Sequence, residues 1–179
     1  MSFIRKREKY LTWEEAFMGQ AVLISQRSKD PNTQVGACLV SEDNYILSLG
    51  YNGLPLGMND DDFNWTRDLE DPNNKYKYVC HAESNAIDNF KGEKKNLYNS
   101  TIYVTLFPCS DCAKRIVQNK IGKVVYLSDK YENTPDNLVA KRILDSANVD
   151  YVQFEKKYQK KYTLKLTPDY GLKENNQDE

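Results

Sequence analysis

The chain has 179 residues, a length typical of a single domain, and 40% of its residues are hydrophobic while 28% are charged. This balance excludes a fibrous or largely disordered chain. The net charge of −1 excludes a general attraction to nucleic acid and leaves only a local basic patch as a route to it. No stretch approaches the roughly 20 apolar residues of a membrane span. We expect one folded domain over residues 1–165 and a flexible tail over 166–179.

The N-terminal segment MSFIRKREKYLTWEEAF is charged and lacks the apolar core of a secretory signal, so we expect a cytoplasmic protein. Four cysteines in an intracellular chain of this size argue against a disulfide framework. They favour instead a metal-binding or redox role for the Cys-x-x-Cys pair formed by Cys109 and Cys112.

The first predicted elements are a helix and a hairpin. Residues 11–28 carry apolar side chains near helical spacing, and Thr12 with Glu15 forms a capping-box signature at the start. The apolar runs at 35–41 and 45–53, separated by the short turn EDN, indicate two adjacent strands.

Residues 54–78 follow as a long stretch rich in Asn and Asp, with no sustained period. Structureless loops of this length are uncommon in compact domains and tend to be functional. Beyond it, helices and strands alternate, which implies crossover connections and an α/β fold with a mixed five-stranded sheet and helices on both faces. The predicted helices cover 81–89, 110–119 and 136–147, and the predicted strands cover 101–106, 123–128 and 149–154. From Asp169 onward we expect no regular structure.

Two short motifs at predicted helix starts carry the candidate chemistry. His81, the single histidine, is followed two residues later by Glu83, while Cys109 and Cys112 stand one helical turn apart. Zinc binds imidazole nitrogen and thiolate sulfur in tetrahedral geometry, and a catalytic site keeps one of the four positions for water. His81, Cys109 and Cys112 are therefore candidate ligands of one zinc ion.

Other interpretations of these residues stay open. Cys-x-x-Cys alone also fits a redox pair or two core cysteines. A structural zinc site would require a fourth ligand, which would have to be Cys38, Cys80 or a carboxylate. For Glu83, the alternative is a solvated carboxylate in the first turn of a helix, favoured there by the helix dipole.

His-x-Glu followed by Pro-Cys-x-x-Cys resembles the signature of zinc-dependent deaminases. The resemblance extends to the deoxycytidylate deaminase family, whose members convert dCMP to dUMP. It is carried, in the family's order, by SKDPNTQVGACLV, GYNGLPLG, YVCHAESNAI, YVTLFPCSDCAK and SDKY, which span about residues 28–131. It implies the three-layer α-β-α cytidine deaminase-like fold with strand order 2-1-3-4-5, one Zn²⁺ per chain, and Glu83 as the group that moves protons between the water, the pyrimidine ring and the departing ammonia.

The resemblance also implies substrate contacts. Asn52 would bind the sugar or base, the backbone beside Ala82 would bind the pyrimidine, and Tyr131 with Arg27 would approach the 5′-phosphate. The residues by themselves leave other roles open. Asn52 also fits a turn, Tyr131 also fits ordinary packing, and Arg27 also fits a solvated cation at a helix end.

Family members are commonly activated by dCTP, inhibited by dTTP and assembled as homo-hexamers, and we expect the same here without identifying allosteric residues. Residues 57–67 resemble a family segment in which adjacent carboxylates, here Asp60, Asp61 and Asp62, would help to hold Mg²⁺ with a triphosphate. The alternative is a solvated acidic loop. Some relatives bind a second zinc through histidines in this loop, and this chain has none there, so we expect one zinc ion.

The sequence leaves two alternative functions open. A deaminase of the same fold acting on tRNA or single-stranded polynucleotide would need cations and aromatic side chains, and residues 155–165, EKKYQKKYTLK, are the one candidate for them. A lysine-rich edge strand fits this segment equally. The second is a zinc-stabilised binding module without turnover. We expect the small-molecule substrate dCMP, with no stable nucleic-acid partner and no membrane partner.

Overall fold

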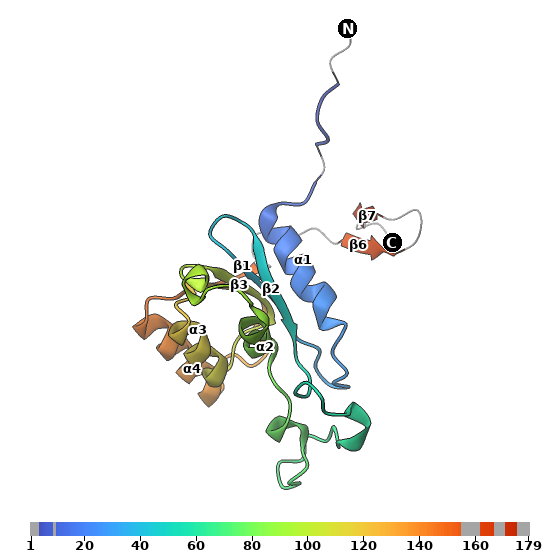
Figure 1. Ribbon diagram of the computed structural model, residues 1–179, viewed down its shortest axis with the longest axis vertical. Coiled ribbons are helices and arrows are strands. Elements are labelled where there is room, and N and C mark those ends of the chain that lie inside the picture. The colour runs from blue at the N-terminus through green and yellow to red at the C-terminus, as the bar shows by residue number, and fades with distance from the viewer. Residues whose placement is uncertain (1–3, 9, 155–161, 167–170, 175–179) are drawn as a thin grey trace.

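A computed structural model of the chain describes residues 4–8, 10–154, 162–166 and 171–174. Its centre is a five-stranded sheet with the strand order β2-β1-β3-β4-β5 (Figure 1). Strand β1 is antiparallel to both of its neighbours, β2 and β3, whereas β3, β4 and β5 are parallel to one another. The strands are β1 (Gly36–Val40), β2 (Ile46–Tyr51), β3 (Thr101–Leu106), β4 (Lys123–Ser128) and β5 (Asp150–Gln153). The mixed five-stranded sheet and its order confirm the expected fold.

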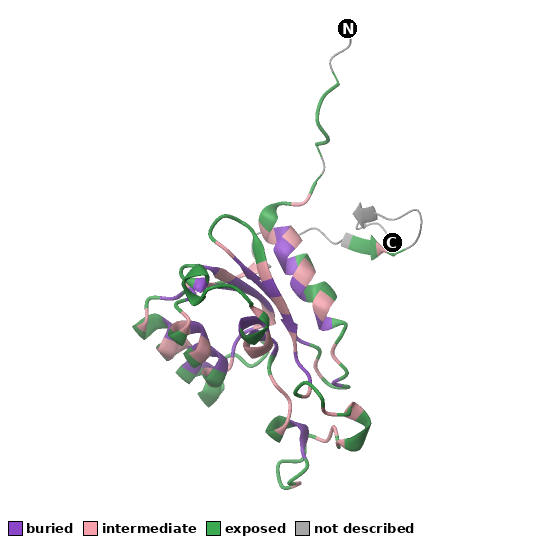
Figure 2. Cartoon of the chain, viewed as in Figure 1, coloured by how far each residue is buried: buried purple, intermediate pink, exposed green. Residues whose placement is uncertain are grey.

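Helices cover both faces of this sheet, as expected. Within the described residues the α-helices are α1 (Trp13–Ser25), α2 (Ala82–Asn89), α3 (Ser110–Gln118) and α4 (Pro135–Ser146). Helix α1 lies on one face, and α2, α3 and α4 lie on the other (Figure 1). Buried residues follow the central strands and the helix faces turned toward them (Figure 2). None of the helices in the described part of the chain is long and apolar enough to cross a bilayer.

Helix α1 begins at the predicted capping box and ends earlier than predicted. The Thr12 hydroxyl accepts a hydrogen bond of 3.2 Å from the Glu15 N–H, and the Glu15 carboxylate accepts one of 2.7 Å from the Thr12 N–H. The helix ends at Ser25 instead of residue 28. A tertiary contact accompanies this earlier end: the Ser28 hydroxyl donates a hydrogen bond of 2.9 Å to the Asn52 carbonyl oxygen, after β2.

Helix α2 packs directly on strand β2 at Gly50. A Cβ atom at this position would lie 2.3 Å from the carbonyl oxygen of Ala82 and 2.3 Å from the backbone nitrogen of Ala86, so the close approach requires glycine. The neighbouring Ser48 hydroxyl donates a hydrogen bond of 2.6 Å to the carbonyl oxygen of Ala86. These contacts fix the start of α2, where His81 lies.

The parallel strands bring two loops to the same edge of the sheet. Strand β3 ends at Leu106 shortly before α3, and β4 ends at Ser128 shortly before α4. Because the carboxyl ends of parallel strands meet at one edge, Cys109 and the loop 129–134 lie on the same side of the molecule, where α/β proteins commonly bind ligands.

A two-stranded antiparallel sheet follows near the C-terminus, formed by β6 (Tyr162–Lys165) and β7 (Gly171–Glu174). The expectation of no regular structure after Asp169 misses β7, because a strand of four residues shows almost no apolar period. The candidate nucleic-acid segment lies mostly outside the described residues, which do not include Lys156, Lys157, Tyr158, Lys160 and Lys161.

Candidate active site

His81, Cys109 and Cys112 come together at the starts of two helices. His81 is the N-cap residue of α2, Cys109 is the N-cap residue of α3, and Cys112 lies in the first turn of α3. The His81 Nδ1 atom is 3.3 Å from the Cys109 Sγ atom and 3.4 Å from the Cys112 Sγ atom. Within the described part of the chain, this is the one group of three or more histidine, cysteine or acidic side chains arranged to hold a metal ion.

The spacing of this group fits zinc. A tetrahedral zinc ion with ordinary bond lengths holds its nitrogen and sulfur ligands about 3.6 Å apart. Observed N···S distances of 3.3 and 3.4 Å are close to that separation. Cys38 and Cys80, considered from the sequence as a fourth ligand, do not belong to the group. Three protein ligands are the number found in catalytic zinc sites.

The protonation of these residues shows how strongly they interact before a metal binds. A hydrogen bond with Cys109 raises the pKa of His81 to about 9. A hydrogen bond with Cys112 lowers the pKa of Cys109 to about 4, and the same contact, together with burial, raises the pKa of the Cys112 thiol. A metal ion would replace these protons, because thiolates and a neutral imidazole are the forms that bind metal.

Glu83 lies in the first turn of α2, two residues after His81, and its side chain is 4% exposed. Burial raises the pKa of this carboxyl, while the charge of His81 lowers it. A carboxyl with a raised pKa can take up and return a proton near neutral pH, as general acid–base catalysis requires. The solvated carboxylate considered from the sequence does not describe this buried side chain.

The site opens into one cavity of about 330 Å³, a volume that accommodates a small organic ligand. His81, Glu83 and Cys109 contribute to it together with apolar side chains from β3 and the loop after it. Three of the substrate-binding residues expected from the sequence also line this cavity: Asn52, Ala82 and Tyr131.

Arg27 does not line the same cavity. It is exposed after the end of α1 and borders a separate cavity of about 170 Å³, together with Lys29 and Asp60. The guanidinium that does border the larger cavity belongs to Arg67, in the long loop before α2. The Arg67 Nε–H donates a hydrogen bond of 2.9 Å to the Tyr76 hydroxyl, and this bond raises the pKa of Arg67.

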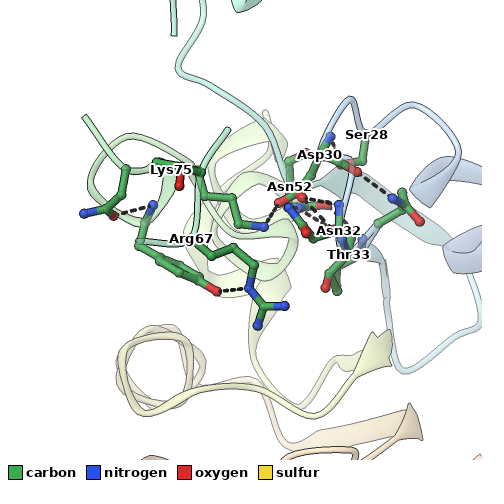
Figure 3. A network of polar contacts seen from close by, with 12 residues as sticks. Ser28, Asp30, Asn32, Thr33, Asn52, Arg67 and Lys75 are labelled. Atoms are coloured by element: carbon green, nitrogen blue, oxygen red, sulfur yellow. Dashed lines mark hydrogen bonds and ion pairs between the residues drawn. The ribbon is translucent and has the colours of Figure 1, made fainter. Parts of the chain in front are cut away.

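A buried polar network forms one wall of the larger cavity (Figure 3). The Lys75 ammonium lies 2.5 Å from the Asp30 carboxylate, and both side chains are almost completely buried. The Asn52 side chain donates to the Thr33 carbonyl oxygen at 2.9 Å and accepts from the Val35 N–H at 2.8 Å. The network joins the long loop to the segment before β1, so Asn52 has a structural role besides any contact with a ligand.

The starts of α3 and α4 are held together beside the metal group. Asp136 accepts a hydrogen bond of 3.1 Å from the Ser110 N–H and another of 2.5 Å from the Ser110 hydroxyl. Ser110 directly follows Cys109, so these bonds fix the position of that ligand. On the far side of α3, Arg115 pairs with Asp88 and connects α3 to α2.

Comparison with known proteins agrees with this geometry. Residues 11–128 match the family described as the cytidine and deoxycytidylate deaminase zinc-binding region. The chain belongs to this family. Family membership makes it a zinc-dependent deaminase, in agreement with the His-Cys-Cys group and the neighbouring buried glutamate.

Individual relatives cover most of this deaminase. It is similar to the deoxycytidylate deaminases of Pongo abelii and Homo sapiens, each 46% identical over 151 residues that cover 84% of this chain and 84% of the relative. Among solved structures, it is similar to the dCMP deaminase from cyanophage S-TIM5 in complex with dCMP and dUMP. That protein is 30% identical, with a TM-score of 0.64, and the match covers 79% of this chain and 96% of the other.

Sequence reasoning assigned no cavity role to several polar residues that line it, among them Arg67, Lys75 and Asn137. Arg67 and Lys75 lie in the long loop before α2. The length of this loop indicates a functional segment, but it does not indicate which of its residues line the cavity. Asn137 lies in the first turn of α4. Asparagine is common near the start of a helix, so its presence there does not indicate a binding residue.

Proposed function

We propose that this chain catalyses the hydrolytic deamination of dCMP to dUMP and ammonia, in the service of dTMP synthesis. The observation that carries the proposal is that two members of the His-Cys-Cys group, His81 and Cys109, lie with buried Glu83 in the wall of one cavity. Support for the substrate comes from relatives named deoxycytidylate deaminases and from the similar phage protein solved with dCMP and dUMP.

In the proposed mechanism, His81, Cys109 and Cys112 would hold one Zn²⁺, and the ion would supply a bound water whose pKa is lowered to about 7. Glu83 accepts one proton from the attacking water and delivers it to ring nitrogen N3 as the oxygen bonds to C4. Glu83 then carries the second proton of that water to the amine as the C4–N bond breaks. The products are dUMP and ammonia, and Glu83 returns to its starting state.

The remaining cavity groups suit the other parts of the nucleotide. The amides of the first turn of α2, beside Ala82, have no partner within the helix and suit the pyrimidine carbonyl oxygen. Arg67 and Tyr131 suit the 5′-phosphate, because a guanidinium binds phosphate oxygens in pairs. Arg67 takes the place of Arg27 in this part of the proposal, since Arg27 borders the other cavity.

Regulation and assembly complete the proposal. Activation by dCTP, inhibition by dTTP and assembly into a homo-hexamer rest on the resemblance to the family as a whole, and the part played by Mg²⁺ rests on the resemblance of residues 57–67 to the family segment. All four cysteines are free thiols, which supports a reducing, cytoplasmic environment. Sedimentation and initial rates, each measured with dCTP plus Mg²⁺ and with dTTP, test these points together.

The central experiment measures ammonia release from dCMP, CMP and deoxycytidine by the wild-type protein and by Glu83→Gln. We expect dCMP to be strongly preferred. Glu83→Gln should keep its zinc and its fold and lose about 10²- to 10⁴-fold in kcat, because the proton carrier is gone. Glu93→Gln, which changes a glutamate whose side chain is 72% exposed, is the matched control.

Two results would contradict the proposal. Equal rates on all three compounds would remove dCMP as the preferred substrate. Turnover of Glu83→Gln equal to that of the wild type would remove Glu83 from the chemistry.

A further inference from the structure

Arg67 is the cation of the cavity wall that is available to an anionic ligand. Among the described residues that line the cavity, the cationic side chains are Arg67 and Lys75, besides the imidazole of the proposed metal ligand His81. Lys75 is 5% exposed and is paired with the Asp30 carboxylate. Arg67 is exposed, and its Nε–H bonds to a neutral hydroxyl group, that of Tyr76. An anion that enters the cavity therefore finds its counter-charge at Arg67.

Tyr76 holds this guanidinium at one defined atom. The Arg67 Nε–H donates a hydrogen bond of 2.9 Å to the Tyr76 hydroxyl (Figure 3). A guanidinium carries five N–H donors in one plane, one on Nε and two on each terminal nitrogen. Because the Nε–H is already bonded, the four N–H groups of the terminal nitrogens remain. They form the edge of the plane that binds two oxygens of a phosphate in parallel.

The acceptor that Tyr76 supplies belongs to the anchored end of the long loop. Its backbone N–H donates a hydrogen bond of 3.1 Å to the Asn74 side-chain oxygen. The preceding residue is Lys75, whose ammonium is bonded to buried Asp30 and lies 5.3 Å from the centre of the Tyr76 ring. Arg67 is nine residues earlier and exposed. The hydroxyl therefore restricts a long side chain that would otherwise lose rotamer freedom on binding a ligand.

A ligand in the cavity can reach these groups. Tyr76 is 50% exposed, and both Tyr76 and Arg67 line the cavity. Tyr131, in the loop after β4, lines the same cavity. The hydroxyl of Tyr76 and, to a smaller extent, that of Tyr131 raise the pKa of Arg67, so the guanidinium lies near both. Two hydroxyl groups and one cation thus gather at one part of the cavity.

The anion that suits this arrangement is a terminal phosphate, and this step rests on the function proposed above. The phosphate of dCMP carries three terminal oxygens, of which two match the two terminal nitrogens of a guanidinium. We propose that Tyr76 is a positioning residue, whose hydroxyl holds Arg67 so that both terminal nitrogens bind the 5′-phosphate. Tyr76 thereby determines the preference for a nucleoside 5′-monophosphate over the nucleoside.

The test removes the Tyr76 hydroxyl and compares a substrate with the phosphate to one without it. Wild type and Tyr76→Phe are assayed for ammonia release from dCMP and from deoxycytidine. We expect Tyr76→Phe to lower the ratio of kcat/KM for dCMP to kcat/KM for deoxycytidine about tenfold, chiefly through a higher KM for dCMP. An unchanged ratio would overturn the proposal, because the hydroxyl would then make no difference to phosphate binding.

Tyr78→Phe is the matched control. The Tyr78 hydroxyl donates a hydrogen bond of 3.4 Å to the Pro72 carbonyl oxygen in the same loop, and Tyr78 does not line the cavity. This variant should keep the ratio of the wild type. A fall as large as that of Tyr76→Phe would overturn the proposal, since general loosening of the loop would explain both.

A second pair of variants tests whether Tyr76 acts through Arg67. Arg67→Lys keeps the positive charge but has no Nε–H for the tyrosine to accept. Tyr76→Phe added to Arg67→Lys should therefore change the ratio less than about twofold. A further loss as large as that of Tyr76→Phe alone would overturn the positioning role, because the hydroxyl would then contact the nucleotide directly.

A binding measurement distinguishes failure of this proposal from failure of the proposed function. If the wild type releases no ammonia from dCMP, the proposed function fails. Calorimetry with dUMP and deoxyuridine then decides the role of Tyr76. A wild-type preference for dUMP that Tyr76→Phe lowers about tenfold supports the proposal. Equal affinities, a preference that Tyr76→Phe leaves unchanged, or no binding of either compound overturns it.

Discussion

Lys75 and Asp30 form an ion pair of 2.5 Å in which the two side chains are 5% and 3% exposed. The pair joins the long loop before α2 to the turn before β1 and lies beside Asn52 in the cavity wall (Figure 3). Each charge is out of contact with water and depends on the other for its stabilisation. This buried contact is therefore one of those that attach the loop and hold Arg67 in position.

Removal of Lys75 should be strongly destabilising. Lys75→Met leaves the Asp30 carboxylate buried without its counter-charge, and we expect the free energy of unfolding to fall by about 3 kcal/mol in urea titrations. Lys29→Met is the control, because Lys29 pairs with Asp60 and its side chain is 61% exposed. Its effect should be much smaller, since exposed ion pairs contribute little. Similar losses in both variants would contradict this interpretation.

The same pair should make stability depend on pH. Burial alone would raise the pKa of Asp30, but hydrogen bonds from Lys75 and from the backbone N–H of Asn32 and Thr33 hold it below its ordinary value. A lowered pKa in the folded state stabilises the protein above about pH 4, and this contribution is lost as the pH falls through the folded-state pKa. The stability difference between wild type and Lys75→Met should therefore narrow as the pH falls from 7 to 3. A constant difference over this range would exclude Asp30 as its source.

Metal content should separate the proposed ligands from the nearby cysteine. Cys109→Ser should retain far less zinc than the wild type after gel filtration and should melt at a lower temperature, because metal binding and folding are coupled. Cys80→Ser changes the residue next to His81 but not a member of the metal group, so its zinc content should equal that of the wild type. Zinc measured by mass spectrometry checks both, and loss of zinc from Cys80→Ser would make Cys80 a fourth ligand.

A methyl group at Gly50 should disturb the start of α2. Because the added Cβ would lie 2.3 Å from two backbone atoms of α2, Gly50→Ala should lower the free energy of unfolding by about 1–3 kcal/mol and reduce turnover by moving Glu83. Gly19→Ala is the matched control, since Gly19 is exposed in α1 and nothing lies within 4 Å of an added Cβ. It should leave stability unchanged or raise it by up to about 1 kcal/mol. An effect at Gly50 no larger than at Gly19 would contradict the close packing.

The central strands and the metal group could be predicted because their signals are local. Strands β3 and β4 have the predicted bounds, since both are apolar runs ended by turn residues. His81, Cys109 and Cys112 follow from motifs of two to four residues placed at helix starts. In each case a few neighbouring residues determine both the structure and the chemistry.

The groups around the rest of the cavity could not be predicted because their positions depend on distant parts of the chain. Arg27 and Arg67 are both cations near turns, and only the folded path of the long loop brings Arg67 to the larger cavity. The partner of Lys75 is 45 residues away, and no period in the sequence connects them. The Asn137 side chain is oriented by a hydrogen bond to Asp129, in the loop after β4.

The long loop leaves the fold and returns to it at a single point. The Gly53 N–H donates to the Cys80 carbonyl oxygen at 3.1 Å, and the Cys80 N–H donates to the Gly53 carbonyl oxygen at 2.8 Å. Cys80 directly precedes His81, so the metal group begins where the loop closes. Because its two ends are hydrogen-bonded to each other, the loop can be replaced as a unit. Chimaeras that carry the corresponding segment of a relative between Gly53 and Cys80 would alter what enters the cavity while keeping the same catalytic frame.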